Sequence, residues 1–239
     1  MPVKFNINQA LNLFNANGGE TNFPKSLKDV LQYLQNDNNV NNIKEASYFL
    51  ATAKAESDYS LQRWEADYLC GEKGVPYQNI PCQKALDYYR SSDGKSNYYS
   101  KGVDSNGVPY FGRGLIQLTN NYNYEKYGDK IGVDLLNDGD KALIPKNSYK
   151  IASEYLKAKT FKYVNDNDFT GARKSVNGGT KGVDRTNNEY NLWIDIFSDP
   201  RVKFESIFWT KRKRVIAISI LSLFLVVGGL FIIKGIKNK

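Results

Sequence analysis

Residues 111–124 read FGRGLIQLTNNYNY, and this short segment combines glycines with amide, hydroxyl and aromatic side chains. Glycines flank Arg113, so the backbone can turn sharply there or approach another group closely. The side chains that follow can hold sugar hydroxyls, N-acetyl groups or a water molecule, or offer a flat face to a sugar ring. They are Gln117, Thr119, Tyr122, Asn123 and Tyr124. A helix N-terminus with incidental tyrosines is the alternative interpretation, and the segment alone does not decide between them.

Two glutamates upstream are candidates for acid–base chemistry. Glu56 ends an otherwise apolar helical pattern, and Glu65 follows nine residues later, directly after Trp64. A carboxyl at the rim of an apolar helix is placed to donate a proton, while a second carboxylate across from it activates water. Two exposed glutamates on a helix and a loop are the alternative, which the spacing alone does not exclude.

The composition excludes several classes of catalytic site. The 239 residues contain no histidine, which excludes Ser-His-Asp and Cys-His catalysis, HExxH metalloproteases and His-ligated zinc. Cys70 and Cys82 are too few for a four-thiolate site. Residues 166–171 begin like a calcium loop, but the twelfth position is Asn177 rather than glutamate, so we interpret them as a solvated turn. We predict no metal and no cofactor.

Apolar periodicity predicts a mostly helical domain. In residues 43–56, apolar side chains recur at three- and four-residue spacings. Four further helices are predicted over Ile7–Phe14, Leu27–Leu34, Ser148–Leu156 and Glu189–Phe197. Between Cys70 and Gly114 the chain is rich in Gly, Pro, Ser and Asn, which predicts loops with a short hairpin. For Cys70 and Cys82, a disulfide and two reduced thiols remain equal alternatives.

Three segments, at residues 56–65, 111–124 and 175–179, together resemble family 19 glycoside hydrolases. This is the chitinase-like branch of the lysozyme superfamily, which includes phage and bacterial endolysins. Residues 111–124 resemble the glycine-arginine-glycine block of that family, and Asn177-Gly178-Gly179 resembles its Asn-Gly-Gly turn. Glu56-Ser57 resembles the family's His-Glu-[Ser/Thr] helix end, although Ala55 stands where the histidine would be. The resemblance covers roughly residues 40–195.

The resemblance implies a mainly α, lysozyme-like, two-lobed helical domain with a central cleft. It implies that Glu56 is the general acid, that Glu65 is the general base and that Thr119 helps to position the attacking water. Hydrolysis would invert the anomeric configuration, with carboxyl groups about 6.5–9.5 Å apart. The substrate-binding residues predicted on this basis are Trp64, Gln117, Tyr122, Asn123, Asn177 and Arg185.

The C-terminal tail predicts a membrane anchor. Residues 215–233 contain no charged side chain, and as a helix they would span ~28 Å, close to the ~30 Å hydrocarbon core of a bilayer. Basic clusters on both sides disfavour the alternative of a buried core helix. The predicted organisation is a catalytic domain (1–199), a basic juxtamembrane connector (200–214), a transmembrane helix (215–233) and a basic tail (234–239).

The tail also explains the charge of the chain. The formal net charge is +8, and the seven Lys and Arg residues of positions 211–239 leave only +1 for residues 1–210. The folded domain therefore lacks the excess charge of a polyanion site, and we predict no nucleic-acid partner. The predicted partners are peptidoglycan or a related glycan, and a lipid membrane through the C-terminal helix. The oligomeric state stays open.

The predicted function is a membrane-anchored, cell-wall-lytic glycoside hydrolase that cleaves β-1,4 bonds between N-acetylated sugars of peptidoglycan. An anchored, Asn- and Lys-rich chain of this size is typical of a phage or bacterial wall-lysis protein. Since the N-terminus has no apolar signal-peptide pattern, we expect the internal membrane of a phage virion, or otherwise the host inner membrane. A chitinase, a lytic transglycosylase and a non-catalytic glycan-binding or structural membrane protein remain alternatives.

Overall fold

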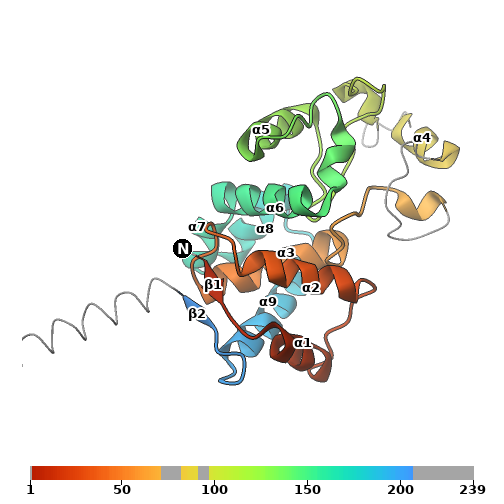
Figure 1. Cartoon of the computed structure of the whole chain (residues 1–239). Coiled ribbons are helices and arrows are strands. Elements are labelled where there is room, and N and C mark those ends of the chain that lie inside the picture. Colours follow the sequence, from red (N-terminus) through yellow and green to blue (C-terminus); the bar gives the residue numbers. More distant parts are fainter. Residues whose placement is uncertain (1, 71–81, 91–96, 207–239) are drawn as a thin grey trace, which may run out of the picture.

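The computed structural model describes residues 2–70, 82–90 and 97–206, and these are mainly helical, as predicted (Figure 1). The α-helices are α1 (Ile7–Ala16), α2 (Pro24–Leu34), α3 (Ile43–Ser57), α4 (Gln83–Arg90), α5 (Asn121–Ile131), α6 (Pro145–Lys159), α7 (Phe161–Asn165), α8 (Phe169–Asn177) and α9 (Val183–Ser198). Three short 3₁₀ helices are η1 (Asp67–Cys70), η2 (Tyr98–Lys101) and η3 (Gly139–Leu143). Strands β1 (Val3–Lys4) and β2 (Glu205–Ser206) form a small antiparallel pair.

Helix α3 lies in the middle of the core and packs most extensively against α9. All residues from Glu45 to Ala53 are buried, so the helix is enclosed on every side rather than along one stripe. It begins where the Asn42 side chain accepts a hydrogen bond from the Glu45 amide, and it ends at Asp58, which adopts left-handed geometry with φ of 54°. These two caps fix the last turn, and with it the position of Glu56.

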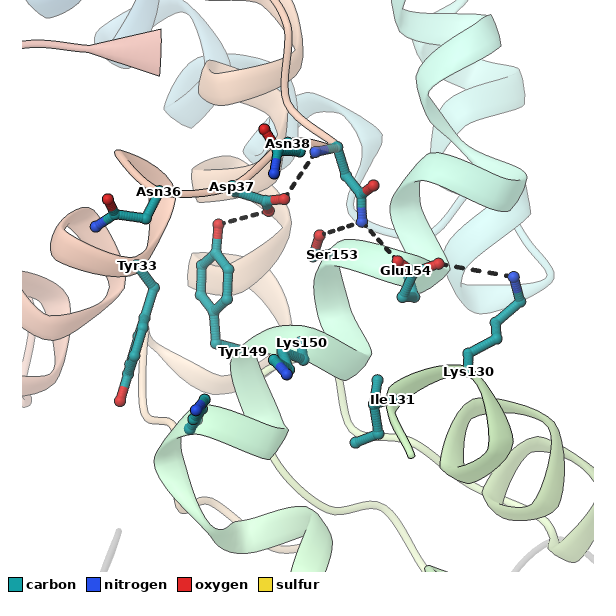
Figure 2. A pocket seen from close by; sticks show the side chains of 12 residues that line it. Tyr33, Asn36, Asp37, Asn38, Lys130, Ile131, Tyr149, Lys150, Ser153 and Glu154 are labelled. Carbon is teal, nitrogen blue, oxygen red and sulfur yellow. Dashed lines mark hydrogen bonds and ion pairs between the residues drawn. The ribbon is translucent and has the colours of Figure 1, made fainter. Parts of the chain in front are cut away.

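The helices lie on both sides of α6. In Figure 1, α4 and α5 lie on one side of α6, and α1, α2, α3 and α9 lie on the other. The turn after α2 is tied to α6 by two hydrogen bonds (Figure 2). The Tyr149 hydroxyl donates to Asp37 (2.8 Å), and the side-chain amide of Asn39 donates to the Ser153 hydroxyl (2.8 Å). A pocket of about 510 Å³ opens at this junction.

The five predicted helices are confirmed as α1, α2, α3, α6 and α9, each extended by one or more residues. The prediction of loops between residues 70 and 114 was wrong for residues 83–90, which form α4, and for the short turn η2. Helix α4 is only eight residues long and buries Ala85 and Tyr89 one turn apart, a pattern too short to recognise beside Gly- and Pro-rich neighbours. The expected hairpin has its counterpart in the bridge between Val103 and Pro109.

The two ends of the described chain meet at the β1–β2 pair, where Val3 lies opposite Ser206. Residues 200–206, which the sequence assigned to the connector, pack on the helical domain. Val202 is fully buried and its carbonyl accepts from the Asn6 amide (2.7 Å), while Phe204 stacks on Phe5.

No helix of the described ranges has the length and apolar character to cross a membrane. The predicted span at 215–233 lies outside the described residues.

Candidate active site

The segment 111–118 folds around the buried guanidinium of Arg113. Its Nε donates to Asp140 Oδ1 (2.9 Å), its Nη1 donates to the Tyr124 hydroxyl (2.8 Å), and its Cζ lies 3.7 Å from the centroid of the Phe111 ring. Burial raises the pKa of Asp140 to about 6, although the neighbouring Arg113 acts in the opposite direction. Arg113 is therefore an internal clamp of the loop rather than a group that faces a ligand.

The glycines beside Arg113 permit close approach of two other segments. At Gly114, with φ of 75°, a Cβ would lie 2.7 Å from the Ser148 hydroxyl of α6. At Gly112, a Cβ would lie 3.0 Å from the Gln117 amide oxygen and 3.3 Å from the Glu65 carboxylate. A side chain at Gly112 would therefore press on both of these predicted site residues.

Glu65 is held by the backbone of Gly112 and by two tyrosines. Its amide donates to the Gly112 carbonyl (2.7 Å), and its Oε2 accepts from the Gly112 amide (3.1 Å). Its Oε1 accepts from the Tyr98 hydroxyl (2.9 Å). Burial and the negative charge of Glu65 raise the pKa of Tyr98, so this phenol remains a proton-bearing donor at neutral pH. The Tyr88 hydroxyl donates to the same Oε1 at 3.4 Å, so three donors fix the orientation of the carboxylate.

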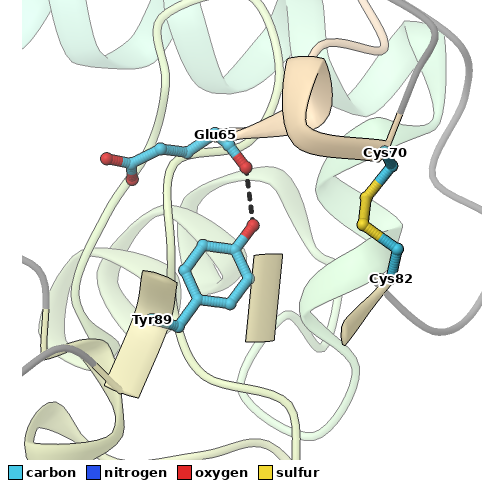
Figure 3. The surroundings of a disulfide bond; sticks show 4 residues. All are labelled: Glu65, Cys70, Cys82 and Tyr89. Carbon is cyan, nitrogen blue, oxygen red and sulfur yellow. Dashed lines mark hydrogen bonds between the residues drawn. A yellow bond between two sulfur atoms is a disulfide. The ribbon is translucent and has the colours of Figure 1, made fainter. Parts of the chain in front are cut away.

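A disulfide stabilises the surroundings of Glu65. Cys70 and Cys82 are joined, which resolves the two alternatives for these thiols (Figure 3). The bond links η1, which begins two residues after Glu65, to the start of α4. From α4, the Tyr89 hydroxyl donates to the Glu65 carbonyl (2.5 Å). The disulfide therefore holds the helix that contacts the backbone of Glu65.

Glu56 lies in the last turn of α3 and pairs with Arg173 of α8. Glu56 Oε1 accepts from Arg173 Nη1 at 2.5 Å, and the side chains are 17% and 11% exposed, so the carboxylate does not point into bulk solvent. Burial, together with the charge of Glu56, raises the pKa of Tyr155.

Arg173 also connects Glu56 to the Asn-Gly-Gly turn. Its Nε donates to the Lys181 carbonyl (3.0 Å), which also accepts from the Asn177 side-chain amide (3.2 Å). The structure thus brings Glu56 and the turn at Asn177 together through Arg173. The sequence did not identify Arg173; the available signal was its position four residues before Asn177, on the same face of a helix.

The end of α3 also contacts the segment 111–118. The Ser57 hydroxyl lies 2.9 Å from the Leu115 carbonyl, so the residue after Glu56 is joined to the same loop that holds Glu65. Gln117 adopts left-handed geometry with φ of 52°, and its amide nitrogen donates to the carbonyls of Arg63 (3.1 Å) and Gly114 (3.0 Å). Gln117 therefore braces the loop.

The remaining predicted site residues differ in accessibility. The Asn123 side-chain amide, in the first turn of α5, donates to the backbone carbonyl of Thr119 (2.8 Å), which precedes the helix. Tyr122 is 63% exposed, whereas Trp64 is 5% exposed and packs against Phe111. The burial of Trp64 gives it a packing role with no open aromatic face.

Arg185 lies near the start of α9 and is exposed. It makes no ion pair with any described residue, so its predicted role in substrate binding stays a prediction.

A model of the glycoside hydrolase family described as chitinase class I matches residues 37–188. The chain therefore belongs to glycoside hydrolase family 19. This confirms the predicted family, a family of glycoside hydrolases. Chitinase 11 of Oryza sativa subsp. japonica is 59% identical over 32 residues, which are 13% of this chain and 12% of that protein. Endochitinase 1 of Theobroma cacao is 57% identical over 47 residues, which are 19% of this chain and 15% of that protein. The matched segment thus spans less than a fifth of either relative.

Two solved structures share the fold of this family 19 chain. Chitinase C from Streptomyces griseus HUT6037 superposes with a TM-score of 0.53 at 21% identity, covering 80% of this chain and 75% of that one. A bacterial family 19 chitinase gives a TM-score of 0.50 at 22% identity, covering 80% and 93%. The predicted lysozyme-like, mainly helical fold is confirmed by this likeness.

Proposed function

We propose that the protein hydrolyses β-1,4 bonds between N-acetylated sugars of peptidoglycan, using Glu56 and Glu65 as acid and base. The supporting observation is that one short loop contacts both Glu65 and the residue next to Glu56. Glu65 bonds to the backbone of Gly112, and Ser57, next to Glu56, contacts the Leu115 carbonyl. A shared loop fixes the relative positions of the α3 end and Glu65, and acid–base hydrolysis of one bond requires such fixed positions.

In this proposal, Glu56 donates its proton to the glycosidic oxygen as the bond to the anomeric carbon breaks. A water molecule attacks that carbon from the opposite face and gives its proton to Glu65. Tyr98 holds Glu65 in place, and Thr119 and Asn177 orient the water and the substrate. Because an ion pair stabilises the charged form of a carboxylate, proton donation requires that the bound glycan weakens the contact between Glu56 and Arg173.

The finer assignments belong to the same proposal. Peptidoglycan is favoured by the basic, apolar tail, because a wall-lysis protein acts next to a membrane. Chitin is the second candidate substrate, since the similar proteins are called chitinases and endochitinases. We propose a central cleft between two lobes, anchoring through residues 215–233, and a phage origin with the protein in the internal membrane of the virion, or otherwise in the host inner membrane.

The test of the activity is mass spectrometry of soluble fragments released from purified sacculi and from chitin by the full-length protein. We expect sacculus fragments with ordinary reducing ends. Glu56→Gln should lower their release by at least ~100-fold, while the matched exposed control Glu20→Gln should not.

Other outcomes would replace the proposal with a named alternative. Anhydro-sugar ends, together with near-normal activity of Glu65→Gln, would identify a lytic transglycosylase. Fragments from chitin alone would identify a chitinase. Tight wall binding without fragments, unchanged by Glu56→Gln, would identify a non-catalytic glycan-binding protein.

The anchor is tested by flotation of the full-length protein with lipid vesicles. We expect it to float with the vesicles, and we expect the double variant Leu225→Arg/Val226→Arg to stay behind, because charges inside a bilayer are costly. A full-length protein that remains in the dense fractions would contradict the anchor. Absence from purified virions would contradict the virion assignment.

A further inference from the structure

The pocket beside the turn after α2 lies on a different face of α6 from the candidate active site. The residues of α6 that line it have helical spacings of three and four, and they are Lys146, Tyr149, Lys150, Ser153 and Glu154. Another face of α6 serves the active-site loop, since the Ser148 hydroxyl accepts from the Leu115 amide (2.8 Å). The two sites therefore share a helix but no lining residue.

The acidic groups of this pocket are already satisfied by its own donors. Asp37 accepts hydrogen bonds from the Tyr149 hydroxyl (2.8 Å) and from the backbone amide of Asn39 (2.8 Å). Glu154 accepts from the Asn39 side chain (2.8 Å) and lies 3.6 Å from the Lys130 ammonium (Figure 2). A cationic ligand would have to displace these donors, so the pocket does not suit one.

Two lysines of the pocket are not paired with a group of opposite charge in the described part of the chain. Lys146 and Lys150 are one turn apart on α6, both are exposed, and neither forms an ion pair within the described part of the chain. They add positive charge to a wall whose carboxylates are neutralised. This arrangement favours a ligand that bears carboxylates.

The rest of the lining suits a saccharide. The half-buried Tyr33 ring lies 5.2 Å from the Tyr149 ring, which itself packs 5.0 Å from Phe49, so the aromatic wall is fixed by the core. Exposed amides of Asn36 and Asn38 stand beside it and can bond hydroxyl or N-acetyl groups. The volume of about 510 Å³ is within the usual size of a small-ligand site, about 300–1,000 Å³.

We propose that this pocket is a second glycan-binding site that takes an acidic, N-acetylated saccharide, such as a peptidoglycan strand whose peptide stems bear carboxylates. The inference rests on the proposed function for the kind of glycan, and it adds a physical reason for preferring peptidoglycan over uncharged chitin. A strand held here remains next to the enzyme between cleavage events.

The test is equilibrium binding of the full-length protein to purified sacculi in the Glu56→Gln background, which blocks cleavage. Adding Lys146→Gln/Lys150→Gln should weaken sacculus binding about tenfold, the effect expected for losing two exposed charge contacts. Sacculi whose carboxylates have been converted to amides should bind the parent about tenfold more weakly, and should not distinguish the parent from the double variant. The matched control Lys4→Gln/Lys28→Gln removes the same charge from exposed positions outside the pocket and should bind as the parent does.

Three results would overturn the proposal. The first is equal binding of sacculi by the parent and the pocket variant, and the second is a loss of about tenfold in sacculus binding by the Lys4→Gln/Lys28→Gln control. The third is that the pocket variant loses binding to chitin, which is uncharged, as much as it loses binding to sacculi. Because binding is measured without cleavage, these results are distinct from failure of the proposed hydrolysis, which appears only as missing fragments.

Discussion

Replacement of Arg113 by lysine should destabilise the fold strongly even though the charge is retained. The guanidinium is fully buried and forms hydrogen bonds to Asp140, the Tyr124 hydroxyl and the Pro109 carbonyl, while it also stacks on Phe111. A lysine ammonium can replace the contact to Asp140, but it cannot present the planar fork that reaches the other acceptors.

The expected cost follows from the contacts that are lost. Two hydrogen bonds from a charged donor, at about 1.5–3 kcal/mol each, predict a loss of about 3–6 kcal/mol in the free energy of unfolding. For a domain of this size that corresponds to a fall in melting temperature of about 6–24 °C. Activity should also decline, because Arg113 holds the loop that fixes Glu65.

The assay is thermal and urea unfolding of the full-length protein, followed by circular dichroism. The matched control is Arg201→Lys, since Arg201 forms two hydrogen bonds to Asp199 but its side chain is 63% exposed. We expect this control to unfold at the wild-type midpoint. Equal midpoints for Arg113→Lys and the wild type, or equal shifts for the two variants, would refute the view that Arg113 is a buried clamp.

Three further predictions concern residues that support the site. Arg173→Met should reduce kcat on sacculi by about tenfold to a hundredfold with little change in KM, because Arg173 positions Glu56; a change confined to KM would contradict that role. The pKa of Asp58 is held low, because hydrogen bonds from its neighbours outweigh burial, so Asp58→Asn should be less stable than the wild type at pH 7. That difference should disappear as the pH falls from about 4 through the pKa of the folded state, and a difference that persists at pH 2 would contradict the assignment. Cys70→Ser/Cys82→Ser should lower the free energy of unfolding by about 2–3 kcal/mol in denaturant titrations, and the oxidised and reduced wild type should differ equally.

Local sequence signals were sufficient for the long helices. The apolar repeat over residues 43–56 defines α3 almost to the residue, and the position of Glu56 follows from it. Helix α4 was missed because two turns with Ala85 and Tyr89 give too little periodicity. Short helices gain their stability from tertiary contacts, which a local pattern does not contain.

In the site, too, the sequence predicted local structure but not the contacts between residues far apart in the chain. The glycines of residues 111–118 indicated a sharp loop, but the clamp depends on Asp140, which lies 27 positions away from Arg113. Arg185, predicted as a substrate-binding residue, is exposed near the start of α9, and it is Arg173 that contacts Glu56 across 117 positions. Sequence patterns identified the kinds of residue involved, and the packing of α8 on α3 and α9 determined which arginine makes the contact.

The most direct measurement of acid–base hydrolysis by Glu56 and Glu65 is the anomeric configuration of the first product. Proton NMR spectra recorded within the first minutes of digestion, before mutarotation, distinguish the α from the β form of the newly formed reducing sugar. Attack by a water molecule from the face opposite the departing sugar predicts the α anomer, and its appearance should be abolished by Glu56→Gln. Initial formation of the β anomer, or of a product without a reducing end, would contradict the assignment of Glu65 as the base.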